Sequence, residues 1–340
     1  MAGAEVIRIQ DGRRADPQLC RGRTADGRPC RNRAGASGYC KRHEPAAGRA
    51  ATPAAGRAAT PAPSRFEADL ERALAFLRRR VTGAYAVDDF GFDPDLTENV
   101  LLPILRPLFD RWWRVEQRGL ENIPASGPAL LVSNHSGTLP LDALMMKLAI
   151  YEGTGRHCRL LAADLPFRLP FVGEIARKSG NTLACAEDST RLLDAGEIVG
   201  VFPEGYKGIG KPFRERYKLQ RFGRGGFVEV ALRTGAPMIP VSIVGAEEIY
   251  PMIYNVKPLA RLLGFPYFPL TPTFPALGLL GAIPLPSKWI IEYGEPIQTA
   301  PFTPDAALDP MFVFNLTDQV REAIQQTLYK NLMSRRSVFF

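Results

Sequence analysis

Short apolar runs alternate with amphipathic segments from about residue 129 onward, and this alternation limits the folds open to the chain more than any other feature. Five runs have the length and composition of buried strands: residues 129–132, 160–163, 198–202, 238–244 and 289–293. Four segments with helical spacing stand between or after them: residues 141–150, 189–195, 225–234 and 316–333. The alternation predicts an α/β domain with a central, mostly parallel sheet flanked by helices, whose strand ends carry the chemistry.

The positive charge of the chain belongs to its first fifth. The 340 residues carry a formal net charge of +8, which taken alone suggests nucleic acid or an anionic membrane as a partner. Residues 1–65 hold 13 of the 43 Lys and Arg residues and 5 of the 35 Asp and Glu residues, so residues 66–340 hold 30 of each. The two parts therefore need separate interpretations, and the larger one is neutral.

Three cysteines and one histidine stand at metal-ligand spacing in the basic part. Cys20, Cys30, Cys40 and His43 form the pattern C-x9-C-x9-C-x2-H. Such a set binds Zn²⁺ tetrahedrally, and the ion would supply the folding energy of a segment with almost no apolar core. The pattern resembles the short Cys3His zinc modules of the WRC type. We expect a zinc module over residues 20–43, with a disordered basic arm as the alternative. The sequence does not identify the binding partner of this module.

Low-complexity sequence surrounds this module. We expect residues 1–19 to be disordered. The octapeptide Ala-Ala-Gly-Arg-Ala-Ala-Thr-Pro occurs at 46–53 and again at 54–61, and a tract without an apolar face cannot bury a core. The repeat therefore indicates a flexible linker over residues 44–65.

The sequence favours a cytoplasmic protein. Five cysteines are too few for a disulfide scaffold, and the chain does not open with the basic and apolar regions of a signal peptide. Residues 262–287 lack any charge, but six prolines interrupt them, which a membrane-spanning helix would not tolerate. We expect no transmembrane helix and a peripheral association with membranes.

Residues 66–118 are predicted to be helical. Apolar residues recur at helical spacing over 66–80, which indicates an amphipathic helix. Residues 99–118 combine Trp112 and Trp113 with several arginines, a composition that suits either a membrane interface or a helix packed on the core. The main domain is expected to follow at residues 119–340.

A histidine and a carboxylate flank the turn after the first predicted strand. His135 follows the run Ala-Leu-Leu-Val-Ser-Asn, and Asp142 opens the next helical segment. A carboxylate can hold one ring nitrogen of a histidine, so that the other nitrogen accepts a proton from a substrate. The pair therefore predicts a general base.

Two further blocks give this pair a context. Phe-Pro-Glu-Gly occupies residues 202–205 after another buried strand, and Pro-Met-Ile-Pro-Val occupies residues 237–241. The chain thus has three motifs in order: Asn-His with a nearby Asp, then Phe-Pro-Glu-Gly, then this proline-flanked strand. Their order resembles the glycerolipid acyltransferase family, which includes the 1-acylglycerol-3-phosphate acyltransferases. The resemblance covers about residues 115–300.

The resemblance implies a reaction and roles for individual residues. A lipid hydroxyl attacks the thioester of acyl-CoA or acyl carrier protein, without a covalent acyl-enzyme and without a catalytic cofactor. His135 would be the base and Asp142 its partner. The acceptor, a lysophospholipid at a membrane surface, would contact a loop and cations at Pro203, Glu204, Gly205, Lys207 and Arg177. The family usually separates its His and Asp by four residues, whereas six residues separate them in this chain.

Seven cations follow the Phe-Pro-Glu-Gly block within 18 residues: Lys207, Lys211, Arg214, Arg216, Lys218, Arg221 and Arg224. They indicate either a site for phosphoglycerol, the CoA phosphates or anionic lipid, with Lys211 and Arg224 among its ligands, or a solvated basic face. The uncharged stretch 262–287 would line an acyl groove or lie on the bilayer, with a buried core insertion as the alternative. Two other functions stay open: transfer to a different lipid alcohol, and a lipid-binding or zinc-dependent interaction protein without activity.

Overall fold

The computed structural model divides the chain into two units, Met1–Ser64 and Arg65–Phe340. It describes residues 65–339 except Arg224, and in the first unit Leu19, Arg23, Thr24, Arg28, residues 30–36, Tyr39 and Cys40. The predicted disordered segment up to residue 18, the linker over 44–64, and the residues Cys20, His43 and Arg224 lie outside the described residues.

A seven-stranded sheet forms the centre of the second unit, in the order β1-β9-β6-β2-β5-β3-β4. Its strands are β1 (Glu116–Arg118), β2 (Ala129–Ser133), β3 (Cys158–Ala162), β4 (Asn181–Leu183), β5 (Ile198–Val201), β6 (Met238–Val244) and β9 (Ile290–Tyr293). Every pair is parallel except β6 with β9. The five predicted strands are all present, and the predicted α/β fold class is confirmed.

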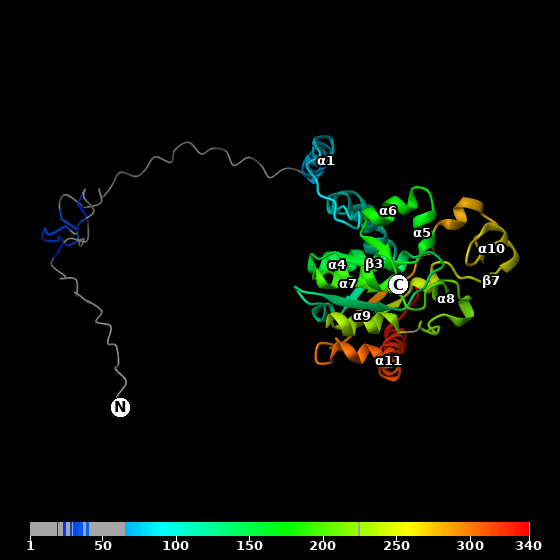
Figure 1. The fold of residues 1–340 in the computed structure, drawn as a ribbon. Helices are drawn as coiled ribbons and strands as arrows, with labels where there is room; N and C mark the ends of the chain where they lie inside the picture. The colour runs from blue at the N-terminus through cyan, green and yellow to red at the C-terminus, as the bar shows by residue number, and fades with distance from the viewer. Residues whose placement is uncertain are drawn as a thin grey trace, which may run out of the picture. The chain divides into compact units, whose positions relative to one another are not determined.

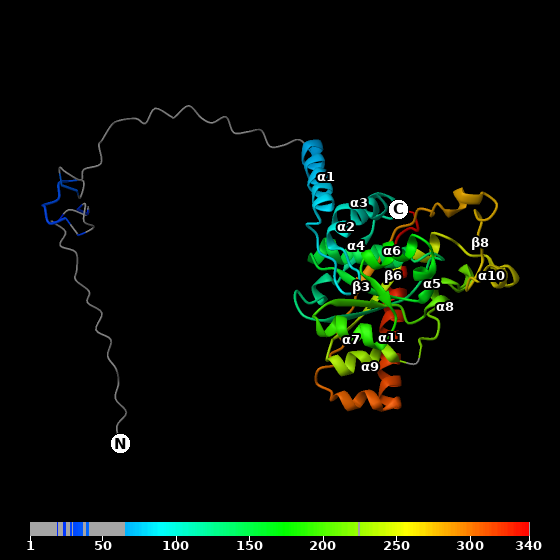
Figure 2. The ribbon, with the colours of Figure 1, turned by 45° about the horizontal axis from the view of Figure 1, so that its top comes forward.

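Helices cover both faces of this sheet. The α-helices of this unit are α1 (Arg65–Thr82), α2 (Pro94–Leu96), α3 (Leu102–Pro107), α4 (Leu141–Thr154), α5 (Asp164–Arg168), α6 (Val172–Lys178), α7 (Ala186–Asp194), α8 (Tyr206–Ile209), α9 (Gly226–Thr234), α10 (Lys257–Leu263) and α11 (Pro310–Ser334). Figure 2 shows α3 and α4 on one side of the sheet and α7, α9 and α11 on the other, and Figure 1 shows α4, α9 and α11 in a second view. Leu131 faces the first group and Leu130 the second, as alternation along a strand requires.

The position of β2 decides where chemistry can take place. It lies between β5 and β6 and runs parallel to both, with Leu131 opposite Gly200 and Ile239. Parallel strands end at one edge of a sheet, so the segments that follow β2, β5 and β6 meet there.

The paired tryptophans have different environments. Trp113 is fully buried and stacks on Trp289, with ring centroids 4.6 Å apart, and its indole N–H donates to the carbonyl of Leu285. Trp112 is 39% exposed. Residues 97–112 are helical throughout, and this segment packs on the sheet as part of the core. Among the described residues, none of the helices has the length and apolar character needed to cross a membrane.

Replacing Trp113 with Ala should therefore destabilise the domain. Loss of a buried aromatic ring leaves a cavity, and we expect the free energy of unfolding to fall by about 3–5 kcal/mol. Trp112→Ala is the matched control and should lower it by less than about 1.5 kcal/mol, because that ring is partly in solvent. Urea denaturation followed by circular dichroism measures both, and equal losses would contradict the burial assigned to Trp113.

Candidate active site

The side chain of Asn134 fixes the segment after β2 by forming two hydrogen bonds with the backbone of β6, as a strand residue would. The Asn134 amide donates to the carbonyl of Ile243 at 3.0 Å, and its oxygen accepts the N–H of Ile243 at 2.8 Å. This reciprocal pair ties the end of β2 to β6. His135 therefore leaves the sheet from a defined point.

A wide turn then brings Asp142 back to the histidine. Gly137 has φ +94° and Thr138 has φ +64°, both in the left-handed region. A Cβ at Gly137 would lie 2.7 Å from the carbonyl oxygen of Ala246, so this position needs glycine for two reasons. The turn ends at Pro140, and α4 places Asp142 in its first turn. The six intervening residues are thus accommodated without separating the two side chains.

His135 and Asp142 are in direct contact. Nδ1 of His135 lies 2.8 Å from Oδ2 of Asp142, which also accepts the N–H of Ser136 at 2.8 Å. Oδ1 accepts the N–H of Ala143 at 2.8 Å. Asp142 is fully buried, whereas the His135 side chain keeps 12% of its surface exposed. The carboxylate fixes the imidazole with Nδ1 inward, which leaves Nε2 to meet a substrate.

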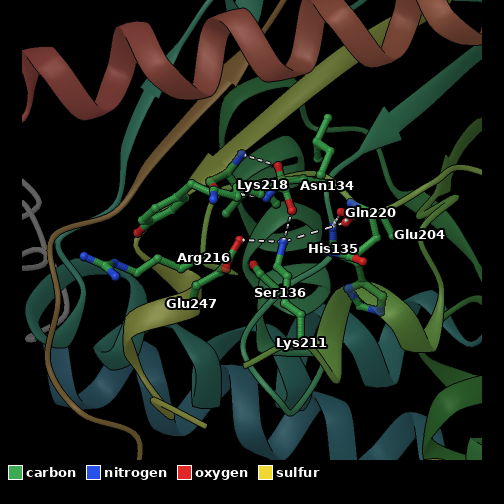
Figure 3. A network of polar contacts seen from close by, with 12 residues as sticks. Asn134, His135, Ser136, Glu204, Lys211, Arg216, Lys218, Gln220 and Glu247 are labelled. Carbon is green, nitrogen blue, oxygen red and sulfur yellow. Dashed lines mark hydrogen bonds and ion pairs between the residues drawn. The ribbon is translucent and has the colours of Figure 1, made fainter. Parts of the chain in front are cut away.

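Glu204 holds the backbone of the same histidine. Its Oε1 accepts the N–H of His135 at 2.9 Å, and its Oε2 accepts the N–H of Gln220 at 2.6 Å (Figure 3). The side chain is fully buried. Gly208 allows this contact, since a Cβ there would lie 2.7 Å from the carbonyl oxygen of His135. The structure therefore places Glu204 inside the protein, where it holds the backbone of the histidine loop, and its contact with an acceptor stays a prediction.

Lys211 is also inside rather than in the predicted surface cluster. Its Nζ lies 3.0 Å from Oε1 of Glu247 and 3.7 Å from Oε2 of Glu204, and it donates to the carbonyl of Lys218 at 3.2 Å. Burial raises the pKa of Glu247 to about 7, against the opposing effect of Lys211. In this structure the protein's own oxygens surround the ammonium group, and substrate binding by Lys211 stays a prediction.

The other predicted substrate residues are distributed over the surface. Gly205 (φ +54°) and Lys207 are exposed at the start of α8, and Pro203 is half-buried. The remaining described cations of the cluster, Arg214, Arg216, Lys218 and Arg221, are exposed. Arg177 is exposed in the last turn of α6 with its guanidinium 4.9 Å from the Phe167 ring centroid, so its partner here is aromatic.

Three contacts at the site were not predicted. The Phe202 ring lies 4.4 Å from the His135 ring, centroid to centroid. The Tyr267 hydroxyl donates to the carbonyl of Thr138. Glu247 follows β6 much as His135 and Glu204 follow β2 and β5, and this repeated position after a buried strand is the signal that could have found it. Tyr267 comes from a distant segment and carries no such signal.

The cysteines of the first unit are the described residues most suited to a metal. The sulfurs of Cys30 and Cys40 are buried and 3.9 Å apart, too far for a disulfide bond. Within the described part of the chain no group of three or more His, Cys, Asp or Glu side chains is placed to hold an ion. Cys20 and His43, the other predicted ligands, are outside that part.

Comparison with family models matches both units. Residues 114–244 match a model described as "Acyltransferase", and residues 17–52 match one described as "Domain of unknown function (DUF5763)". A solved structure, the 1-acyl-sn-glycerophosphate (LPA) acyltransferase PlsC from Thermotoga maritima, superimposes with a TM-score of 0.45 and 20% identity over 81% of this chain and 100% of that one.

Similar curated proteins come from bacteria and animals. An uncharacterized protein of Mycobacterium tuberculosis is 58% identical over 276 residues, which cover 80% of this chain and 77% of that protein. A bovine protein named "DGAT1/2-independent enzyme synthesizing storage lipids" is 24% identical over 220 residues, 65% of this chain and 60% of its own length. The chain belongs to one family with the mycobacterial protein, and within it residues 114–244 match the acyltransferase model.

Proposed function

We propose that the protein is an O-acyltransferase that moves a fatty acyl group from acyl-CoA or acyl carrier protein to a hydroxyl of a lysophospholipid. The simplest acceptor is 1-acylglycerol-3-phosphate. The observation that carries the proposal is the 2.8 Å contact between Nδ1 of His135 and Oδ2 of Asp142 at the sheet edge where strands β2, β5 and β6 end. The acyltransferase domain found by comparison supports it.

The geometry fits general-base catalysis of acyl transfer. Nε2 of His135 takes the proton of the acceptor hydroxyl as its oxygen attacks the thioester carbonyl carbon. The tetrahedral intermediate collapses, the carbon–sulfur bond breaks, and the imidazolium returns the proton to the leaving thiolate. Asp142 stabilises the transient positive charge on the ring, and the backbone N–H groups of Ser136 and Ala143 hold its carboxylate in place.

Exposed cations beyond Phe202 supply a site for the acceptor's phosphate. Lys207 lies two residues after Gly205 and three residues after the tightly held Glu204, and it faces solvent. Lysine binds phosphate as a point charge, so it suits a mobile lipid headgroup. A phosphate-bearing acceptor is therefore favoured over a neutral one.

A neutral lipid alcohol is the second candidate acceptor. The bovine and human relatives, 24% identical to this chain, are named as enzymes that synthesize storage lipids. The dyad would serve either acceptor, because it acts on the hydroxyl alone. Parallel assays with lysophosphatidate and diacylglycerol separate the two, and absence of turnover with every acyl donor would favour a lipid-binding protein without activity.

His135→Ala should abolish most of the transfer activity. Removal of a positioned general base typically lowers kcat by about 10²–10⁴-fold, and Asp142→Asn should fall in the same range because the ring loses its orientation. Asp318→Asn, on the exposed surface of α11, is the matched control and should keep full activity. Thioester consumption with lysophosphatidate measures the rates, and full transfer by His135→Ala would refute the mechanism.

The buried pair of Lys211 and Glu247 gives the domain a pH-dependent stability. The pKa of Glu247 is raised by burial from 4.5 to about 7, so the folded protein holds this proton more tightly than the unfolded chain does. Stability should therefore fall as the pH rises from about 4.5 to about 7 and level off above that, a change of up to about 3 kcal/mol from this group.

Glu247→Gln should remove this contribution. The neutral amide does not titrate, so the slope of unfolding free energy against pH between about 4.5 and 7 should become flatter than in the unchanged protein. Glu229→Gln, an exposed carboxyl on α9, is the control and should leave the slope as it is. Urea denaturation at a series of pH values gives the slopes, and identical slopes for Glu247→Gln and the unchanged protein would contradict the assignment.

We also propose that residues 20–43 bind zinc. Two thiolates bound to one Zn²⁺ at about 2.3 Å in a tetrahedron lie about 3.8 Å apart, close to the 3.9 Å between the sulfurs of Cys30 and Cys40. Cys20 and His43 complete a closed Cys3His set by their position in the sequence. The ion would have a structural role, since a closed set leaves no position for a substrate.

The full chain should carry about one zinc ion when purified without chelator. Cys30→Ser and Cys40→Ser should each lose it, whereas Cys185→Ser, in the second unit, should retain it. Metal analysis by mass spectrometry provides the measurement. A metal content that is unaffected by Cys30→Ser, or no zinc in the unchanged protein, would exclude this site.

A further inference from the structure

An arm projects from the fold between β6 and β9. Residues 254–283, called the arm below, form the pair β7 (Tyr254–Asn255) and β8 (Pro269–Leu270) with α10 between them, and return through the 3-10 turn Gly278–Ala282. Figures 1 and 2 both show this segment beyond α8, at the edge of the domain. It is therefore an addition to the sheet rather than a layer over it.

The arm presents large apolar side chains to solvent. Leu262 is 81% exposed at the end of α10, and Leu279 is 94% exposed in the 3-10 turn. Leu263, which follows Leu262 in the chain, is exposed as well, and so are Leu277, Leu280 and Ile283, which are close to Leu279 in the sequence. Soluble proteins seldom leave such a group of side chains uncovered, so the arm has the character of an interaction surface.

The charges of the arm identify what it would contact. Residues 249–291 contain no Asp or Glu, and the exposed Lys257 and Arg261 lie on α10 next to the leucines. Cations at the border of an apolar surface match a bilayer, where headgroup phosphates lie above acyl chains. The run of 43 residues without Asp or Glu places no side chain there that anionic headgroups would repel.

The arm is bonded to the loop that carries His135. The Tyr267 hydroxyl donates to the carbonyl of Thr138, and a Cβ at Gly210 would lie 2.9 Å from the Tyr267 ring, so the ring packs directly on that glycine. Burial raises the pKa of the Tyr267 hydroxyl above its usual range, which keeps it a donor. The Tyr250 hydroxyl donates to the carbonyl of Ala282 at 2.5 Å and holds the returning part of the arm.

We propose that the arm docks the protein on an anionic phospholipid bilayer, with Leu262, Leu279 and Leu280 among the acyl chains. Lys257 and Arg261 then lie at the level of the headgroup phosphates. Because Tyr267 joins the arm to the His135 loop, docking holds the active site at the surface where a lipid hydroxyl is found. This last step rests on the proposed function, whereas the docking itself does not.

Helix α1 is a second exposed apolar surface and serves as the comparison. Leu70 and Leu74 are 48% and 56% exposed, and they recur with Leu77 on one face. Two cations of its last turn are engaged, because Arg80 binds Asp93 at 2.6 Å and Arg79 binds Asp95, whereas Arg78 is exposed. The arm thus has the more exposed leucines, and both cations of α10 are exposed.

Vesicle flotation of the full chain tests the docking. The vesicles are phosphatidylcholine with roughly one third phosphatidylglycerol. Leu262→Ser/Leu279→Ser should reduce the bound fraction at least about tenfold, because two buried apolar side chains are lost. The matched variant Leu70→Ser/Leu74→Ser should bind within about twofold of the unchanged protein. Unchanged binding of the arm variant, or equal losses in both variants, would overturn the proposal.

A charge variant provides a second, independent measurement. Lys257→Glu/Arg261→Glu should lose binding to the anionic vesicles about tenfold or more, and the unchanged protein should bind less well as salt is raised. If the arm instead pairs two copies of the chain, Leu262→Ser/Leu279→Ser will convert a dimer to a monomer in sedimentation velocity without any change in flotation, and that result would also overturn the proposal.

Activity on detergent-solubilised substrate separates this proposal from the proposed function. The arm variants should acylate lysophosphatidate in mixed micelles at rates within about threefold of the unchanged protein, since the dyad is untouched. On vesicles their rates should fall with the bound fraction. A protein that floats but shows no transfer with any acyl donor would refute the acyltransferase function and leave the docking surface standing.

Discussion

The parallel pairing of β2 with β5 on one side and β6 on the other is the constraint on which the remaining structure depends. Leu130 and Leu131 are fully buried between the two helical layers, so the register of these strands has no freedom to shift. The three strands end together, and each is followed by a polar residue of the site: His135, Glu204 or Glu247. A shift of one residue in any pair would turn these side chains to the wrong face.

The same edge must then accommodate buried charge. Glu204 and Glu247 are two carboxylates that share one ammonium group, Lys211, in a place with little access to water. The carboxylate of Glu204 is stabilised further by hydrogen bonds from the backbone N–H groups of His135 and Gln220. Burial raises the pKa of Glu247. Removing one partner of such a set leaves an uncompensated charge, so the network favours a single arrangement of the histidine loop.

Sequence patterns predicted the parts of the molecule that depend on local composition. The buried runs became strands, and the order of His135, Asp142 and Glu204 led to the site because all three stand at strand or helix ends. The sheet order depends on long-range pairing, which no local pattern contains. The direction of a side chain is equally hidden: Lys211 and Lys218 belong to one basic run, yet the first points inward to Glu247 and the second is exposed.

The wide turn between His135 and Asp142 depends on the arm, because the arm supplies a hydrogen-bond donor that the turn lacks. A loop that turns through left-handed residues at Gly137 and Thr138 cannot pair all its carbonyls within itself, and an unpaired carbonyl in a dry site is costly. Tyr267 supplies the missing donor for Thr138 from the arm, and Tyr250 receives the Thr138 hydroxyl on its carbonyl at 3.2 Å. The longer spacing is therefore compatible with a rigid dyad only because residues more than a hundred positions later reach back to it. In this chain the hydrogen bond from Tyr267 to Thr138 connects the loop that positions the base to the surface that would contact the lipid.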